Sequence, residues 1–158
     1  MIKSTLKQIF KIKNLTNKIH IFNDNIKKLN IKMSIFNHTI IKKNKDIIIY
    51  NYNNIFEIAF GKTQLGNDKI IDLYQDVKYD CYWYHLYYDS SAHLIIYNKS
   101  EKTIQSNDEN TILEYFYPKD KIISKSKKPV IMKCLLSDIK KTNTLGLVSV
   151  SNEIIIKI

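Results

Sequence analysis

The sequence predicts a mixed α/β protein of the α+β type. It would consist of N-terminal helices, a central antiparallel β region with an inserted hairpin, and a small β-rich C-terminal half. Three observations support this fold class. Apolar residues recur at helical spacing before residue 36, β-branched and aromatic runs follow from residue 39, and alternating runs close the chain. With 158 residues, 44% of them hydrophobic, the chain can bury a core without disulfides.

The first segment is predicted to be helical. Leu6, Ile9 and Phe10 lie on one face of a short amphipathic helix whose other face carries lysines, and 23–36 can form a second helix. A mitochondrial presequence is also amphipathic and poor in acidic residues, but it is rich in Arg, which this chain lacks. Cleavage of residues 1–20 is therefore left open.

The middle of the chain is predicted to be mostly β. Residues 69–76 fit either a helix or a strand, and the polar stretch 99–111 is predicted to be a loop. We assign residues 1–60 to helices plus a β hairpin, 61–110 to a Tyr-rich insertion, and 111–158 to an RNA-binding half. The predicted strands are 39–42, 46–52, 55–60, a hairpin of 80–88 with 92–98, and 112–117.

The last forty residues begin with a basic run, 119–128, that contains five lysines. A strand over 130–135 and one short helical turn over 137–141 are predicted to follow. Residues 145–150 and 153–158 then alternate around Ser151-Asn152, which predicts a tight terminal hairpin.

The charge balance points to a polyanionic partner. The chain has 25 Lys+Arg, all of them Lys, against 15 Asp+Glu, a net charge of +10. Such a chain attracts nucleic acid by releasing counterions from the phosphates, with an anionic membrane surface as the second choice. AT-rich codon usage explains part of the lysine excess but not the shortage of acidic residues. Apolar runs are strand-sized, so no membrane span is predicted.

No motif predicts catalysis, a cofactor or a metal. Gly61-Lys62-Thr63 resembles the end of a phosphate-binding loop, but Glu57 stands where the upstream glycine is required, so Lys62 is interpreted as a loop lysine. Neither the metal-ligating side chains nor the carboxylates show a functional spacing, and these are interpreted as structural or solvated residues. The residues concerned are Cys81, Cys134, His85, His93, Asp72, Asp76, Asp80 and Asp89.

Two groups of residues are candidates for binding a partner. Lysines can position phosphates, while hydroxyl and amide groups of the terminal turn can bond to sugar and base edges. This RNA-binding set is Lys125, Lys127, Lys128, Lys133, Ser149, Ser151 and Asn152. Aromatic residues are enriched in protein interfaces, and they can also stack on bases. The set predicted to form a protein interface is Tyr82, Trp83, Tyr84, Tyr87 and Tyr88.

The C-terminal quarter resembles the family of the eighth protein of the small ribosomal subunit. The resemblance lies in Ile123-Ser124-Lys125, the strand 130–133, the turn 137–141 and the segment 145–154. It implies that the Ser-Thr-Ser triplet of the family's RNA-binding loop corresponds to Ser149, Val150 and Ser151. The chain departs from the family pattern at Val150 and Glu153, and residues 61–110 would be an insertion.

The resulting hypothesis is a structural component of an organellar small ribosomal subunit, located in the mitochondrial matrix. It would bind ribosomal RNA and neighbouring ribosomal proteins, without a small-molecule substrate or catalysis. An accessory subunit of a mitochondrial respiratory or ATP synthase complex, using the Tyr-rich hairpin as its interface, is the alternative. A free single-strand binder that uses the aromatic cluster is a third hypothesis.

Overall fold

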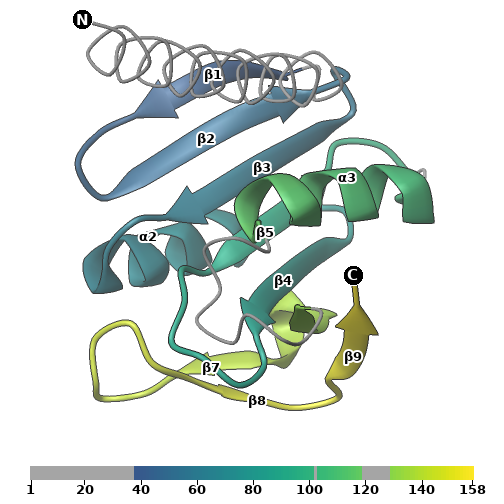
Figure 1. Ribbon diagram of the computed structural model, residues 1–158. Helices are drawn as coiled ribbons and strands as arrows, with labels where there is room; N and C mark the ends of the chain where they lie inside the picture. The colour runs from purple at the N-terminus through teal and green to yellow at the C-terminus, as the bar shows by residue number, and fades with distance from the viewer. Residues whose placement is uncertain (1–37, 102, 119–128) are drawn as a thin grey trace, which may run out of the picture. The chain divides into compact units, whose positions relative to one another are not determined.

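The computed structural model describes residues 38–101, 103–118 and 129–158, which belong to one compact unit with an α+β fold. Its main sheet has seven strands in the order β1-β2-β3-β5-β4-β6-β9, and β7 and β8 form a separate ribbon (Figure 1). The elements are β1 (His38–Lys43), β2 (Ile47–Tyr52), β3 (Phe56–Gly61), α2 (Gln64–Tyr74), β4 (Cys81–Leu86), β5 (Leu94–Asn98), α3 (Ser106–Phe116), β6 (Val130–Leu135), η2 (Leu136–Asp138), β7 (Ile139–Lys141), β8 (Val148–Val150) and β9 (Ile154–Lys157). The predicted α+β class is confirmed.

All neighbouring strands of the main sheet are antiparallel. β1, β2 and β3 follow one another directly, whereas α2 connects β3 to β4, and the β4–β5 hairpin places β5 between β3 and β4. α3 then connects β5 to β6, which pairs with the other side of β4. β1 and β9 are therefore the two edges of the sheet. The predicted strands 39–42, 46–52, 55–60, 80–88, 92–98 and 130–135 are confirmed as β1 to β6.

The central strands are buried on both faces of the sheet, because α2 packs on one face and α3 on the other. Ile47 and Ile49 of β2 belong to the cluster that contains Ile70 of α2, while Ile48 belongs to the cluster that contains Ile112 of α3. Successive strand residues point to opposite faces, so a strand between two layers needs apolar residues on both sides. This requirement explains why the central strands are nearly continuous apolar runs.

Most of the segment 69–76, which the sequence left open between helix and strand, belongs to α2, which begins earlier, at Gln64. Thr63 has an extended backbone before the helix, and its hydroxyl accepts a hydrogen bond from the Gly66 N–H at 3.0 Å. This is the N-cap arrangement that satisfies a free amide of the first helical turn. Ile70, Ile71 and Tyr74 then fall on one helical face and are buried against the sheet.

The predicted strand over 112–117 is wrong, because most of this segment belongs to α3. The helix starts within the polar stretch 99–111 that was predicted to be a loop. Asp108 and Glu109 lie in its first turn, where the positive end of the helix dipole stabilises carboxylates. Ile112 and Leu113 are its buried residues. A run of only two adjacent buried positions gives a weak helical period, which explains the error.

A partly buried polar network fixes α3 to the sheet. The carboxylate of Glu109 accepts a hydrogen bond from the Tyr84 hydroxyl at 2.5 Å and forms an ion pair with Lys133 at 2.6 Å. The Lys133 ammonium also lies 4.3 Å from the centre of the Tyr82 ring. β4 and β6 therefore hold the same helix residue from two neighbouring strands.

The residues predicted to be an insertion lie at the centre of the fold. The segment 61–110 supplies α2, β4, β5 and the start of α3, and β4 and β5 lie within the seven-stranded sheet with strands on either side. Removing this segment would take one of the two neighbouring strands from β3 and one from β6, and would split the sheet. A division into 1–60, 61–110 and 111–158 therefore does not match the described structure.

The predicted terminal hairpin is also wrong. β8 pairs with β7 in the small ribbon, whereas β9 pairs with β6 at the edge of the main sheet. Asn152, with a φ of 54°, lies in the turn that directs the chain from the ribbon to the sheet. The helical turn expected over 137–141 is the three-residue η2, and Ile139 already belongs to β7.

The two faces of α2 give a prediction about stability. Ile70 is fully buried whereas Leu73 on the same helix is half exposed. We expect Ile70→Ala to lower the free energy of unfolding by about 3 kcal/mol, because it leaves a cavity, and Leu73→Ala by less than about 1 kcal/mol. Urea denaturation of both variants tests this; equal losses would contradict the assigned orientation of α2.

Candidate functional site

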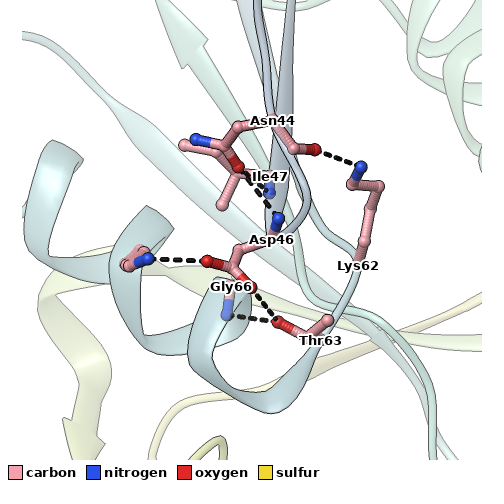
Figure 2. Close-up of polar contacts among 7 residues, drawn as sticks. Asn44, Asp46, Ile47, Lys62, Thr63 and Gly66 are labelled. Atoms are coloured by element: carbon pink, nitrogen blue, oxygen red, sulfur yellow. Dashed lines mark hydrogen bonds and ion pairs between the residues drawn. The ribbon is translucent and has the colours of Figure 1, made fainter.

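Polar groups gather where β3 ends and α2 begins, beside the turn between β1 and β2. The side chain of Asn44 accepts hydrogen bonds from the backbone N–H groups of Asp46 and Ile47, both at 2.9 Å, which closes the turn. Figure 2 shows the Lys62 ammonium reaching back to the carbonyl oxygen of Asn44. The backbone N–H of Lys62 donates to the carbonyl oxygen of Asp46 at 2.7 Å.

The Asp46 carboxylate is the centre of this junction. It is buried, and it forms an ion pair with Lys69 of α2 at 2.7 Å and accepts a hydrogen bond from the Thr63 hydroxyl at 3.1 Å (Figure 2). The Lys69 hydrogen bond is the largest influence on the pKa of Asp46, which lies below its usual value. The carboxylate is therefore ionised at neutral pH, and Lys69 neutralises its charge.

Two glycines allow the backbones to approach at this junction. A Cβ atom at Gly66 would lie 2.1 Å from the carbonyl oxygen of Asp46, and one at Gly61 would lie 2.3 Å from Oδ1 of Asn67. Neither distance is compatible with a side chain. Only glycine therefore fits at positions 61 and 66, because the neighbouring atoms leave no room for a Cβ atom.

A polar cavity of about 300 Å³ opens beside the junction. It lies between the start of α2 and the loop that joins β4 to β5. Its lining carries hydroxyl, amide and ammonium groups but no carboxylate, which suits an anionic or hydroxylated ligand. The lining residues are Gly61, Lys62, Thr63, Gln64, Asn67, Ser90, Ser91 and Ala92.

The β4–β5 loop is held by side chains beneath it. The Leu86 N–H donates to the Ser91 hydroxyl at 3.0 Å, and the Ser91 N–H donates to Nε2 of His85 at 3.3 Å. His93 packs against His85 with ring centres 5.4 Å apart, and its backbone N–H donates to Oδ1 of Asn67 at 3.0 Å. The loop side of the cavity and the α2 side are therefore tied together through Asn67.

The imidazole of His93 is buried and has no hydrogen-bond partner for Nδ1 among the described residues. Burial, and then the neighbouring His85, lower the pKa of His93 from 6.5 to about 3. Burial also lowers the pKa of His85. Both rings are neutral at pH 7 and act as packing groups beneath the loop.

The predicted aromatic interface divides into core and surface residues. Trp83 and Tyr84 are 1% and 0% exposed, so their assignment to a contact surface is corrected: they pack on opposite faces of the sheet. Tyr82 is partly buried beside Lys133. Tyr87 is exposed, and Tyr88 is 82% exposed, with their ring centres 4.5 Å apart. The burial of both Trp83 and Tyr84 could not be predicted, because the sequence of β4 fits a strand with one exposed face equally well.

The predicted RNA-binding residues are not brought together within the described part of the chain. Lys125, Lys127 and Lys128 lie outside the described residues, and Lys133 is paired with Glu109. The hydroxyls of Ser149 and Ser151 donate to the carbonyl oxygens of Lys140 and Asp138, and the Asn152 amide donates to Asp138. These last groups are exposed, but they close the β7–β8 ribbon. Their contact with RNA stays a prediction.

The other residues considered from the sequence have structural positions. Cys81 and Cys134 are buried free thiols whose pKa burial raises to about 12. Asp72 pairs with Lys141 at 2.6 Å. Within residues 38–101, 103–118 and 129–158, no three metal-ligating side chains gather to form a site, and no helix is long and apolar enough to cross a membrane.

Sequence reasoning missed the cavity, although one signal for it was present. Gly61-Lys62-Thr63 does lie between a strand and a helix, the local context that a phosphate-binding loop requires. The motif was rejected because the upstream glycine is missing. In this fold Gly61 and Gly66 instead allow the close contacts with Asn67 and Asp46. The contribution of Asn67 and of the loop 90–92 depends on tertiary contacts that spacing cannot show.

Comparison with known proteins gives a likeness of fold alone. No family model and no curated protein sequence matches the chain. Among solved structures, the C-terminal part of the fibronectin/fibrinogen-binding protein from Streptococcus suis is similar, with a TM-score of 0.55 and 16% sequence identity. The match covers 75% of this chain and 47% of that one, so the chain spans about half the length of this structural relative.

The contact at Gly66 leads to a prediction. We expect Gly66→Ala to lower the free energy of unfolding by about 2–4 kcal/mol, because the new methyl group clashes with the Asp46 carbonyl and separates α2 from β2. Leu65→Ala, at an exposed neighbouring position, is the control and should change stability by less than about 1 kcal/mol. Thermal or urea unfolding compares the two, and a stable Gly66→Ala protein would refute the close approach.

The buried imidazole leads to a pH prediction. The unfolded chain protonates His93 near pH 6.5, whereas the folded chain does so only near pH 3, so folding releases a proton between these values. The contribution to stability is complete above pH 6.5 and is lost as the pH falls, by up to about 1.4 kcal/mol per pH unit. Urea unfolding at pH 7.5, 6.0 and 5.0 should show a smaller loss for His93→Gln than for the unchanged protein. Equal slopes would contradict the assignment.

Proposed function

We propose that this protein is a non-catalytic RNA-binding component in which a folded body carries lysine-rich segments. The observation that supports this is the distribution of charge. The described residues contain 11 Lys and 13 Asp or Glu, a net charge of −2. The remaining residues, 1–37, 102 and 119–128, contain 14 Lys and only 2 acidic residues. All of the excess positive charge thus lies outside the described fold.

Codon bias alone does not account for this distribution, since it would act on the whole chain. Several lysines of the fold have carboxylate partners: Lys69 pairs with Asp46, Lys133 with Glu109 and Lys141 with Asp72. The lysines of residues 1–37 and 119–128 have few carboxylates nearby in the sequence. Clustered lysines that lack such neighbours are suited to phosphate groups, and releasing counterions from RNA would drive binding.

The exposed aromatic pair adds a second element. Tyr88 is 82% exposed in the loop after β4 and contacts Tyr87 edge to face. Exposed aromatic rings serve as stacking platforms for the bases of single strands. Because Arg is absent, lysine contacts to phosphate and stacking on tyrosine would favour unpaired RNA over forked readout of base edges.

A component of an organellar small ribosomal subunit is the finer form of this proposal, and it rests on the sequence resemblance and the AT-biased composition. The exposed Tyr87 and Tyr88 also suit a protein partner, which keeps the accessory subunit of a respiratory or ATP synthase complex as a second candidate. The related structure from Streptococcus suis comes from a protein that binds fibronectin and fibrinogen, and such a ligand would likewise require a protein-binding face.

The proposal predicts which lysines matter. Changing Lys125, Lys127 and Lys128 to Gln should weaken binding of a fluorescent single-stranded RNA at least tenfold and reduce the salt dependence of log K by about 2, because three phosphate contacts are lost. The matched control changes Lys43, Lys45 and Lys157, exposed lysines of the folded body, and should have a much smaller effect. Fluorescence anisotropy at several salt concentrations measures both.

Equal weakening by the two triple variants would indicate a general charge effect and would contradict the proposed role of residues 119–128. Absence of RNA binding at low salt by the full chain would reject the function itself. In that case, recovery of the protein in an RNA-free membrane complex would favour the accessory-subunit alternative.

A further inference from the structure

We propose that the cavity between the start of α2 and the β4–β5 loop is a binding site for one phosphate group. The choice of a nucleic acid strand as the source of that phosphate rests on the proposed function, but the site itself does not. The cavity holds about 300 Å³, roughly ten times the share of one water in liquid, so a phosphate and part of an attached sugar can enter.

Asn67 supplies the observation that points to a ligand. The residue is 6% exposed and lines the cavity, and its Oδ1 accepts the backbone N–H of His93. No described residue accepts a hydrogen bond from its amide nitrogen, and this nitrogen is not one of the fully buried atoms without a partner, which are Trp83 Nε1 and His93 Nδ1, so it is accessible to a ligand. Because Oδ1 is occupied, the group that Asn67 offers to the cavity is a donor. A ligand rich in acceptor oxygens satisfies it.

The first turn of α2 adds donors of the same kind. Thr63 caps the Gly66 N–H, but the N–H of Gln64, at the first helical position, has no acceptor within the helix. Gln64 and Thr63 both line the cavity. The eleven-residue helix directs the positive end of its dipole towards this point, where an anion is stabilised.

The charges around the cavity also favour an anion. Lys62 lines it, with its ammonium also donating to the carbonyl oxygen of Asn44, and the buried carboxylate of Asp46 is neutralised by Lys69 at 2.7 Å. Asp68 is directed to the backbone N–H of Gly146 at 3.0 Å. Asp89 precedes Ser90 in the loop but does not line the cavity. Ser90 and Ser91 complete the wall opposite α2, where the Ser91 hydroxyl already accepts the Leu86 N–H and donates to the Ala92 carbonyl oxygen.

The test uses two identical changes on one helix. Gln64→Glu places a negative charge at the cavity, whereas Gln75→Glu places the same charge at the other end of α2. A carboxylate in the first turn favours the helix, so loss of binding by Gln64→Glu cannot be attributed to unfolding. The full chain, labelled with ¹⁵N, is titrated with inorganic phosphate while the side-chain amide of Asn67 and the backbone amide of Gln64 are followed by NMR.

We expect phosphate to shift both signals in the unchanged protein and in Gln75→Glu, and Gln64→Glu to raise the dissociation constant about tenfold. If phosphate leaves both signals in place at tens of millimolar, or if the two variants weaken binding equally, the site is rejected. Neither result bears on RNA binding by the lysine-rich segments, which the anisotropy measurement tests separately.

A second titration identifies the source of the phosphate. Single-stranded RNA should shift the Asn67 signal and compete with inorganic phosphate. If inorganic phosphate binds but RNA, bound elsewhere by anisotropy, leaves Asn67 unchanged, the nucleic-acid assignment is overturned, and the cavity serves a small phosphorylated molecule.

Discussion

The ionised carboxylate of Asp46 joins the turn before β2 to the first two turns of α2. A buried carboxylate is costly unless it is paired and hydrogen-bonded, and Lys69 and Thr63 supply both conditions. The same residue offers its carbonyl oxygen to Lys62, and Gly66 leaves room for that oxygen. The position of α2, the cavity beside it and the Asn67 bridge to the β4–β5 loop all depend on this contact.

The strands of the sheet could be predicted well because their residues are β-branched and aromatic and are bounded by clear turns. Helices α2 and α3 were harder to predict. The helical period of α2 is short, and in α3 the two buried residues Ile112 and Leu113 resemble part of a strand. The pairing of β9 with β6 joins segments about twenty residues apart across a ribbon, which local alternation does not encode.

The candidate site illustrates the same limit. Tyr88 could be nominated from the sequence, and its exposure agrees with a contact role, but Trp83 and Tyr84 in the same aromatic run are core residues. Which aromatic side chains remain accessible depends on α3, whose Ile112 shares a cluster with Tyr84, and on the other face on α2, η2 and β7, whose Ile70, Leu136 and Ile139 share a cluster with Trp83. The lysines show the same limit, because Lys133 cannot be distinguished by sequence from those of 119–128, yet Glu109 gives it a partly buried carboxylate partner.

The two edges of the sheet differ in how they resist unwanted self-association. β1 carries Lys42 and Lys43 and an irregularity between Ile40 and Lys42, features that prevent another strand from continuing the ladder. β9 is regular and exposes Ile154 and Ile155. A regular edge with exposed apolar side chains is an aggregation hazard unless another molecule covers it. At high concentration, and without a partner, the protein would lose solubility first through β9.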